Sequence, residues 1–459
     1  MAIATINPAT GRQVERFEPL AEADIETRLG RAADAARLWR TTSFAERAAR
    51  LRRLGELLDG ERERWAQVIV TEMGKTIRAA RAEVEKCART CRFYADEGAR
   101  MLAEEVVVAG DDRRSIVYQP LGPVLAIMPW NFPFWQVVRF AAPALMAGNV
   151  ALLKHASNVP RCALGLEELC RKSGFPEGAF QTLLVETGPI AGILADARVA
   201  AVTLTGSDSA GAAVAELAGR HLKKAVLELG GSDPFLVMPS ADLDAAVRTA
   251  VDARVLSNGQ SCIAAKRFIV HEAVYDRFAA GMCEAMRALG VGDPMREETD
   301  VGPLATASAR ERLVDQIERS VAAGARRLVG AATLPGDGWY FSPGVLADIP
   351  PSAPASQEEI FGPVALLHRA RSIDHAIAIA NDSRYGLGAA AWTRDPAEAA
   401  RFVRDLEAGS VFVNEMVVSD PRLPFGGIKR SGFGRELGAF GIREFVNIKT
   451  VVLGGLGGS

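Results

Sequence analysis

The sequence predicts an α/β protein with two parallel sheets, each covered by helices on both faces in the doubly wound manner. A chain of 459 residues is too long for a single hydrophobic core, so two or three domains are expected. Short continuous apolar runs alternate with helical patterns in two blocks, one up to residue 230 and one from about 242 to 414. Hydrophobic residues make up 49% and charged residues 24% of the chain, which is the usual balance for a globular protein.

The first hundred residues predict one short strand followed by helices. The strand ends in a turn at 8–11. Apolar residues then recur at helical spacing over 21–39, 46–58 and 63–73, and a fourth helix is expected over 77–102. The many Arg and Glu residues of these helices are interpreted as solvated faces.

Strands and helices alternate from Ser115 onward. A β-rich stretch is broken by Gly122 and Pro123, and the strands expected in the first block are VLAIM, NVALLK, FQTLLV, AAVTLT and KAVLELG. The helices between them are expected to begin near Phe134, Val159, Pro189 and Ser209. A domain boundary is expected near 230–239, and the second block then contains the strands RFIVH, VALLHRA, AAAWT and SVFVN.

Charge and cysteine content narrow the classes of function. The net charge is −2 with no long run of one sign, which argues against nucleic acid or an anionic membrane as a partner. No apolar run reaches the length of a membrane span, and the first residues lack the order of a signal peptide. None of the six cysteines forms a C-x-x-C pair and histidine is scarce, so no metal site is expected. A cytoplasmic protein with reduced thiols fits this inventory.

The stretch 255–270, VLSNGQSCIAAKRFIV, contains a candidate nucleophile. Cys262 is expected at the end of a helix, just before a β-rich run. Its small neighbours Gly259 and Ser261 leave room for a ligand, and a thiolate in such a setting can attack an electrophile. A buried structural cysteine is the alternative, because cysteine is among the most buried residue types.

Polar residues follow four strands of the first block where each strand ends, at 129–133, 154–157, 205–207 and 228–231. The carboxyl ends of parallel strands meet at one edge of a sheet, so these loops are expected to form a cofactor site. Gly206 and Ser207 open a helix whose backbone N–H groups can hold a phosphate, although ordinary helix starts show the same pattern. The common dinucleotide fingerprint G-x-G-x-x-G is missing from this block.

Seven motifs in a fixed order resemble those of the NAD(P)-dependent aldehyde dehydrogenase superfamily. They are PWNFP, LLKHAS, LTGS, LELGG, GQSC, EEIFGPV and PFGGIKRSGFGRE, and the resemblance extends over nearly the whole chain. It is closest to short bacterial succinate-semialdehyde dehydrogenases that use NADP. The resemblance implies a homodimer or homotetramer with an aldehyde dehydrogenase-like fold. Its parts would be a cofactor-binding domain (1–114 and 123–230), a catalytic domain (231–435) and a small β element for oligomerisation (115–122 and 436–459).

The resemblance also implies the catalytic residues. Cys262 would attack the aldehyde carbon to give a thiohemiacetal, whose oxyanion would be held by the Asn131 amide and the Cys262 backbone N–H. Transfer of hydride to the nicotinamide would leave a thioester, and Glu228 would activate water to hydrolyse it. The alternatives are a turn residue for Asn131 and a salt-bridged surface residue for Glu228.

The cofactor implied by the resemblance is NADP, with NAD possible. Lys154 would contact the adenosine ribose, and Ser157 stands where many NAD-preferring relatives have a glutamate that would repel a 2′-phosphate. Glu359 would bind the nicotinamide ribose with Phe361 nearby. The remaining implied contacts are Trp130, Gly206, Ser207 on the pyrophosphate, and Leu229.

For the substrate, the resemblance implies an arginine clamp. Arg139 would hold the distal carboxylate of succinate semialdehyde, helped by Ser419 and Ser261, between the apolar walls Trp135 and Phe425. Some relatives have a second arginine where this chain has a leucine, six residues before the cysteine. Alternatives are an exposed role for Arg139, another aldehyde such as glutarate semialdehyde or a neutral aliphatic aldehyde, and a non-catalytic binding protein on the same scaffold.

Overall fold

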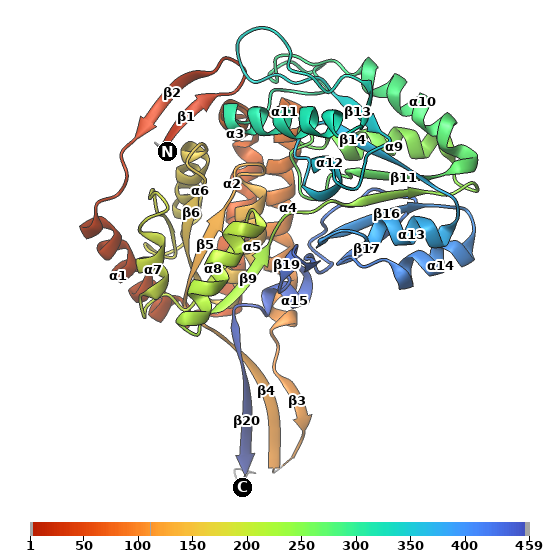
Figure 1. Ribbon diagram of the computed structural model, residues 1–459. Helices are drawn as coiled ribbons and strands as arrows, with labels where there is room; N and C mark the ends of the chain where they lie inside the picture. Colours follow the sequence, from red (N-terminus) through yellow and green to blue (C-terminus); the bar gives the residue numbers. More distant parts are fainter. Residues whose placement is uncertain (1–2, 111, 455–459) are drawn as a thin grey trace.

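The computed structural model describes residues 3–110 and 112–454, and two parallel sheets lie at its centre (Figure 1). The chain begins with an antiparallel pair, β1 (Ile3–Asn7) and β2 (Arg12–Phe17), so the predicted strand and turn are confirmed and a second strand is added. The four predicted helices are also confirmed. They are α1 (Glu22–Trp39), α2 (Phe44–Gly60), α3 (Arg62–Met73) and α4 (Ile77–Met101).

Local sequence explains where these helices begin and end. Ser43 and Glu46 form a capping box that starts α2, and the Thr76 hydroxyl caps α4. Gly74 ends α3 with φ +80°, and a Cβ there would lie 2.9 Å from the Pro303 carbonyl oxygen. A glycine is therefore required at this turn.

The prediction that charged residues of these helices are solvated is wrong at three positions. Arg47, Glu72 and Glu83 are all buried. The Arg47 guanidinium donates to backbone carbonyls, while the two carboxylates accept backbone N–H groups at the starts of other helices. Burial is tolerated because each charged group has partners.

The first sheet has the order β19-β9-β8-β5-β6-β7, with β5 to β9 parallel. Its strands are β5 (Pro123–Met128), β6 (Val150–His155), β7 (Phe180–Thr182), β8 (Ala201–Thr205) and β9 (Lys224–Glu228). The helices between them are α5 (Trp135–Ala147), α6 (Pro160–Lys172), α7 (Ile190–Ala195) and α8 (Asp208–Arg220). Successive strands run outward in both directions from β5, which places a topological switch point at its carboxyl end.

The second sheet has the order β12-β13-β14-β11-β10-β16-β17 and is parallel except at β12. Its strands are β10 (Pro234–Val237), β11 (Arg267–His271), β12 (Arg326–Val329), β13 (Gly344–Ala347), β14 (Val364–Ala370), β16 (Gly388–Trp392) and β17 (Ser410–Val413). The stretch 230–239, predicted as a domain boundary, contains β10. With only four residues, β10 is too short to be recognised as a strand from the hydrophobic pattern.

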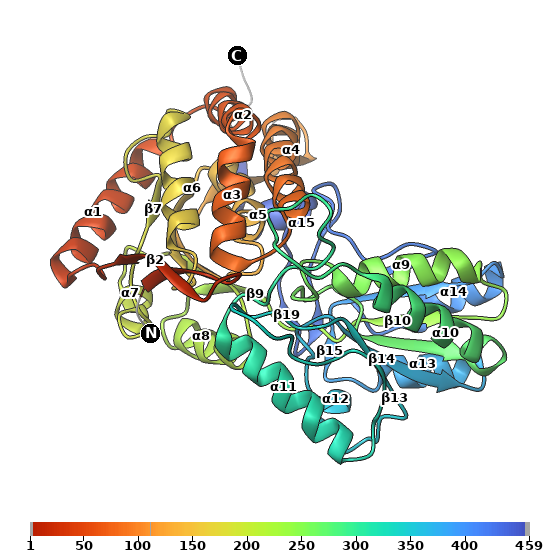
Figure 2. The ribbon, with the colours of Figure 1, turned by 90° about the horizontal axis from the view of Figure 1, so that it is seen from above.

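Helices cover both faces of the second sheet (Figure 2). Phe235 and Phe268 face α9 (Leu243–Val255) and α10 (Glu272–Ala288), whereas Leu236 and Ile269 face α13 (Ile373–Asn381) and α14 (Pro396–Asp405). This alternation follows from the two-residue period of a strand and explains the continuous apolar runs in the sequence. Two further helices, α11 (Ala307–Ala322) and α12 (Pro354–Gln357), precede β12 and β14.

The C-terminal part of the chain returns to the first sheet. A short pair joins β15 (Tyr385–Gly386) to β18 (Ile428–Lys429), and β19 (Gly432–Phe433) then pairs antiparallel with β9. Beyond α15 (Gly438–Ile442), the last described strand is β20 (Val446–Gly454).

An antiparallel arm of three strands projects from the body, with its tip beside the last described residues (Figure 1). In it, β4 (Asp112–Pro120) lies between β20 and β3 (Glu105–Val108). Of the segments predicted to form the oligomerisation element, 115–120 and 446–454 belong to the arm, and 455–459 lie outside the described residues. No helix within the described ranges is long and apolar enough to cross a membrane. The division into cofactor-binding and catalytic domains stays a prediction.

Candidate active site

Cys262 lies in the loop between α9 and β11, and not at the end of a helix as predicted. The helix ends at Val255, and Ser257, Asn258 and Gly259 then take left-handed conformations with φ of 54°, 58° and 74°. Three such residues in succession cannot continue a helix. The turn carries the loop back across the carboxyl end of the first sheet, where the Asn131 amide donates to the Gln260 carbonyl oxygen at 2.9 Å.

Two cavities meet at Cys262. One, of about 830 Å³, is lined by α4, α5, the cysteine loop and residues 416–425. The other, of about 1430 Å³, is lined by the strand-end loops of the first sheet, by α11 and by residues 358–361. Cys262 and Gln136 line both cavities. A reacting group bonded to this sulfur therefore has access to ligands on either side.

The larger cavity contains most of the predicted cofactor residues. They are Trp130, Gly206, Ser207, Leu229, Glu359 and Phe361, together with the predicted catalytic residue Asn131. Ser207 caps the N-terminus of α8, whose first N–H groups and dipole suit a phosphate. The rings of Trp130 and Phe361 meet edge to face with centroids 5.8 Å apart. A helix N-terminus and an aromatic wall in one cavity fit a dinucleotide.

Two predicted cofactor residues do not line this cavity. Lys154 and Ser157 lie at the carboxyl end of β6, and Lys154 is opposite Ile127 of the neighbouring β5. Both are half-buried, and burial lowers the pKa of Lys154. They stand one strand away from Trp130, at the same edge of the sheet.

All five predicted substrate residues line the smaller cavity. They are Trp135, Arg139, Ser261, Ser419 and Phe425. The hydroxyl of Ser261 is buried and has no hydrogen-bond partner among the described residues, so it can accept or donate to a ligand. The other lining residues are mostly apolar, which suits a short aliphatic chain.

Arg139 is buried against protein groups as well as the cavity. It is 3% exposed and forms an ion pair with Glu436, which is 4% exposed. Its guanidinium also donates to the Thr205 hydroxyl at 3.3 Å and lies 4.7 Å from the centre of the Phe425 ring. The alternative of an exposed helix arginine is thus wrong. Glu436 is the last residue of the motif PFGGIKRSGFGRE, but nothing in that motif indicates its partner.

One side-chain N–H of Asn131 has no partner among the residues that the structure describes. One amide hydrogen is directed to Gln260, and the side-chain oxygen accepts from Gln136 Nε2 at 2.9 Å. An amide group carries two N–H bonds, so the second is available to an oxyanion. This hydrogen-bond network fixes the orientation of the Asn131 side chain.

Lys266 links the cysteine loop to Glu359, and sequence reasoning missed it. The buried ammonium donates to the carbonyl oxygens of Ser261 (2.8 Å) and Cys262 (2.6 Å) and lies 3.1 Å from the Glu359 carboxylate. Burial raises the pKa of the Cys262 thiol to about 12, and the charges of Lys266 and Arg139 oppose this shift. The one feature of the sequence that could have indicated this role is the position of Lys266 directly before the apolar strand β11.

Glu228 lines neither of the two cavities. It is buried at the end of β9, opposite Gly432, and a Cβ on Gly426 would lie 2.6 Å from its Oε1. Neither carboxylate oxygen has a hydrogen-bond partner among the described residues. Burial, and secondly the charge of Glu436, raise the pKa of Glu228 well above its usual range. Glu228 therefore binds a proton more readily than a free carboxyl group, and it is not a salt-bridged surface residue.

Three cationic residues of the cavities were also missed. Arg312 and Arg384 line the larger cavity and Lys86 the smaller one. None of them falls in a motif, and Lys86 belongs to a helix whose charges were interpreted as solvated. Within the described ranges, no group of three or more His, Cys, Asp or Glu residues is arranged to hold a metal ion.

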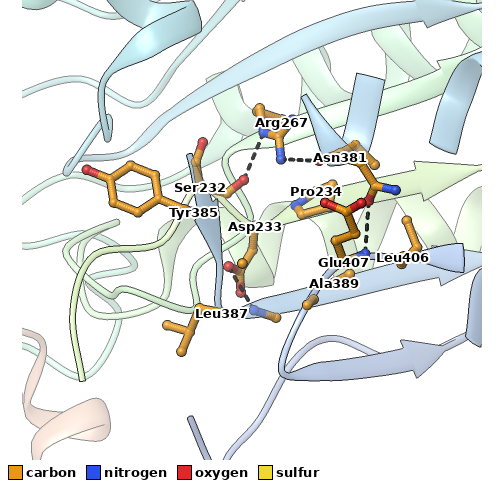
Figure 3. Close-up of a pocket in the computed structure, with 14 residues that line it drawn as sticks. Ser232, Asp233, Pro234, Arg267, Asn381, Tyr385, Leu387, Ala389, Leu406 and Glu407 are labelled. Atoms are coloured by element: carbon orange, nitrogen blue, oxygen red, sulfur yellow. Dashed lines mark hydrogen bonds between the residues drawn. The ribbon is translucent and has the colours of Figure 1, made fainter. Parts of the chain in front are cut away.

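A separate hollow beside the second sheet is structural (Figure 3). The Arg267 guanidinium donates to the backbone oxygens of Ser232 and Ala380, both at 2.8 Å. The Asn381 side chain accepts from the Glu407 N–H at 2.9 Å. The polar groups around this hollow form hydrogen bonds with one another, and these bonds hold α13 against the sheet.

Known proteins resemble this chain over its whole length. The aldehyde dehydrogenase family matches residues 1–451. The chain is 55% identical over 458 residues to a succinate-semialdehyde dehydrogenase (NADP(+)) of Mycobacterium avium, a match that covers 99% of this chain and 97% of that protein. It is 54% identical over 451 residues to a probable succinate-semialdehyde dehydrogenase (NADP(+)) of Synechocystis sp., covering 98% and 99%. The crystal structure of succinic semialdehyde dehydrogenase from Streptococcus pyogenes with NADP+ matches with a TM-score of 0.96 at 36% identity, covering 98% and 99%.

Proposed function

The chain belongs to the aldehyde dehydrogenase family, and on that premise we propose that it oxidises succinate semialdehyde to succinate with NADP as hydride acceptor. The observation that carries this proposal is the position of Cys262 between two cavities. One cavity suits a dinucleotide and the other a short chain with an anionic end. The named activities of the relatives from Mycobacterium avium and Synechocystis sp. support the same reaction.

The protein's own groups account for the first half of the reaction. Cys262 attacks the aldehyde carbon as a thiolate, which the positive charges of Lys266 and Arg139 favour. The free N–H of Asn131 then stabilises the thiohemiacetal oxyanion, an interaction worth about 3 kcal/mol in the transition state. When bound, NADP supplies the hydride acceptor. The product of this half is a thioester on Cys262.

The second half requires the Glu228 carboxylate to reach the thioester on Cys262, although Glu228 lines neither cavity. Its carboxyl group, which lies beside Gly426, must turn toward the cysteine and be ionised to accept a proton from water. Glu436 beside it raises its affinity for a proton, which suits a group that takes a proton from a hydrolytic water. We assign deacylation to Glu228 on this basis.

NADP is the preferred cofactor in this proposal, and NAD is a second acceptor. Lys154 provides a positive charge and Ser157 a hydroxyl at the carboxyl end of β6, where no carboxylate of the motif would repel a 2′-phosphate. The relatives' names give NADP as their cofactor. Neutral serine does not exclude the 2′-hydroxyl of NAD.

We infer that the enzyme is a cytoplasmic homo-oligomer whose arm contacts a second copy. All six cysteines are free thiols, which fits a reducing compartment. The arm exposes apolar side chains on strands without further neighbours, including Ile448 (60%) and Val452 (56%). Exposed apolar edge strands of this kind are normally covered by another chain.

The test is the specificity constant kcat/KM for succinate semialdehyde and for butanal, each with NADP and with NAD. A strong preference for the carboxylated substrate with NADP is expected. The pairing of Arg139 with Glu436 gives weight to a second candidate, oxidation of a neutral aliphatic aldehyde by the same chemistry. Equal rates on both aldehydes would exclude the semialdehyde and favour this candidate.

A further inference from the structure

Helix α4 presents one stripe of residues to the smaller cavity. The stripe consists of Ala79, Ala82, Glu83 and Lys86, at the spacing that places side chains on one face of a helix. Lys86 lies one turn beyond Ala82, at the end of the stripe. Its ammonium donates to the Ser419 hydroxyl at 2.7 Å and lies 4.2 Å from the centre of the Trp135 ring. Both of these neighbours line the same cavity as Cys262.

The positive charge of Lys86 has no carboxylate partner in the described part of the chain. Glu83, one turn away, is held by the Lys75 ammonium at 2.5 Å and accepts the backbone N–H groups of Phe134 and Trp135. Asp420, next to Ser419, is paired with Arg422. The two nearest carboxylates are therefore committed to other groups.

Arg139 differs from Lys86 in this respect. Its guanidinium already has a buried carboxylate, Glu436, on one side and the Thr205 hydroxyl on the other. A substrate carboxylate would have to share Arg139 with Glu436, and two carboxylates on one cation repel each other. Lys86 requires no such sharing, and two of its three N–H bonds remain after the bond to Ser419.

We propose that Lys86, with Ser419, binds the distal carboxylate of the substrate and selects aldehydes that carry a terminal anionic group. This inference rests on the proposed oxidation of succinate semialdehyde and names the residue that gives its specificity. Arg139 lines the same cavity beside Phe425, but Glu436 already offsets its charge, so Lys86 provides the cation without a carboxylate partner among the described residues.

The first experiment compares kcat/KM for succinate semialdehyde with kcat/KM for butanal in wild type and Lys86→Met. Methionine keeps most of the volume of the lysine stem and removes the charge. The ratio of the two constants should fall about 10- to 100-fold, which is the range for loss of a hydrogen bond between charged groups. Lys86→Arg should restore part of the ratio. Arg89→Met is the matched control, since it removes an exposed cation one turn along α4 that does not line the cavity, and its ratio should stay near that of wild type.

A second readout is the pH dependence of KM for succinate semialdehyde. The charged and titratable groups around Lys86 are Glu83, Cys87 and Arg89 on its own helix, Arg139 on α5, and Asp420 beside Ser419. Burial, and secondly the charge of Arg139, lower the pKa of Lys86 to about 8. KM should therefore rise in wild type as the pH passes this value and the ammonium loses its charge, whereas KM for butanal should not follow it. The rise should be absent in Lys86→Met.

The outcomes separate this inference from the proposed function. If wild type prefers succinate semialdehyde but Lys86→Met keeps the same ratio, Lys86 does not bind the carboxylate and the inference is wrong. An equal loss on both aldehydes would give Lys86 a structural role and would also overturn it. A wild type without any preference would instead refute the proposed substrate. Inhibition of butanal oxidation by succinate provides a check in any variant that is poorly active, because the inhibition constant should rise when Lys86 is replaced.

Discussion

Arg139→Met should destabilise the protein by leaving Glu436 without its cation, and the loss should depend on pH. Both side chains are buried, and the carboxylate oxygens of Glu436 have no other partner among the described residues. Burial raises the pKa of Glu436, and the guanidinium opposes that shift. Without the arginine, the buried carboxyl group will take up a proton instead of remaining charged.

The size of the effect follows from this proton uptake. A carboxyl group with an unfolded pKa of 4.5 that is protonated in the folded state costs about 1.36 kcal/mol for each pH unit above that value. The cost is about 3.4 kcal/mol at pH 7 and about 1.4 kcal/mol at pH 5.5. The folded variant binds a proton that the unfolded chain does not, so acidification should stabilise it by about 2 kcal/mol over this range.

Urea denaturation at the two pH values measures the effect, with Arg139→Met/Glu436→Gln as the matched control. The double variant has no titrating group at position 436 and should be more stable than the single variant at pH 7. The difference in unfolding free energy between the double and the single variant should be smaller at pH 5.5. If single and double variants have the same stability at both pH values, Glu436 does not depend on Arg139 and the reasoning is refuted.

Four further predictions concern the proposed chemistry. Cys262→Ser should abolish NADPH formation while a fluorescence titration still detects NADP binding, and surviving turnover would rule out Cys262 as the nucleophile. Glu228→Gln should give one burst of NADPH per site in stopped-flow and then turnover at least about 100-fold slower, since only deacylation needs the carboxylate; a trace without the burst would place Glu228 before hydride transfer. The steady-state rate of wild type should rise as the pH passes the raised pKa of Glu228, because the protonated carboxyl group cannot accept a proton from water. Ser157→Glu should lower kcat/KM with NADP at least about tenfold relative to NAD by repelling the 2′-phosphate, and an equal effect on both cofactors would remove Ser157 from the adenosine end.

Hydrophobic pattern was sufficient to predict most of the fold. The strands of the first sheet and the helices between them begin within one or two residues of their predicted positions, because continuous apolar runs and helical spacing reflect burial directly. Short strands could not be predicted from the hydrophobic pattern. β10 has four residues and β19 two, and each is held by neighbouring strands more than by its own sequence.

The site was predictable as a set of residues but not as a set of contacts. The motifs contain several residues that line the two cavities, among them Cys262 and Asn131, but not Lys86, Arg312 or Arg384. No pattern indicates that Arg139 pairs with Glu436, because the two belong to segments far apart in the chain. Lys86 was missed for a related reason. On an amphipathic helix a lysine usually faces water, and only the tertiary structure shows that this one faces a cavity.

The strand that closes the first sheet is made long after the sheet itself. Gly432 of β19 pairs with Glu228 of β9, and roughly 200 residues of chain lie between them. At a synthesis rate of about 5–20 residues per second, β9 leaves the ribosome some 10–40 s before its partner. During that interval its outer edge is open to any other strand. The second sheet is thus translated while the first is still incomplete, and the predicted general base is among the last groups of the nascent chain to be enclosed.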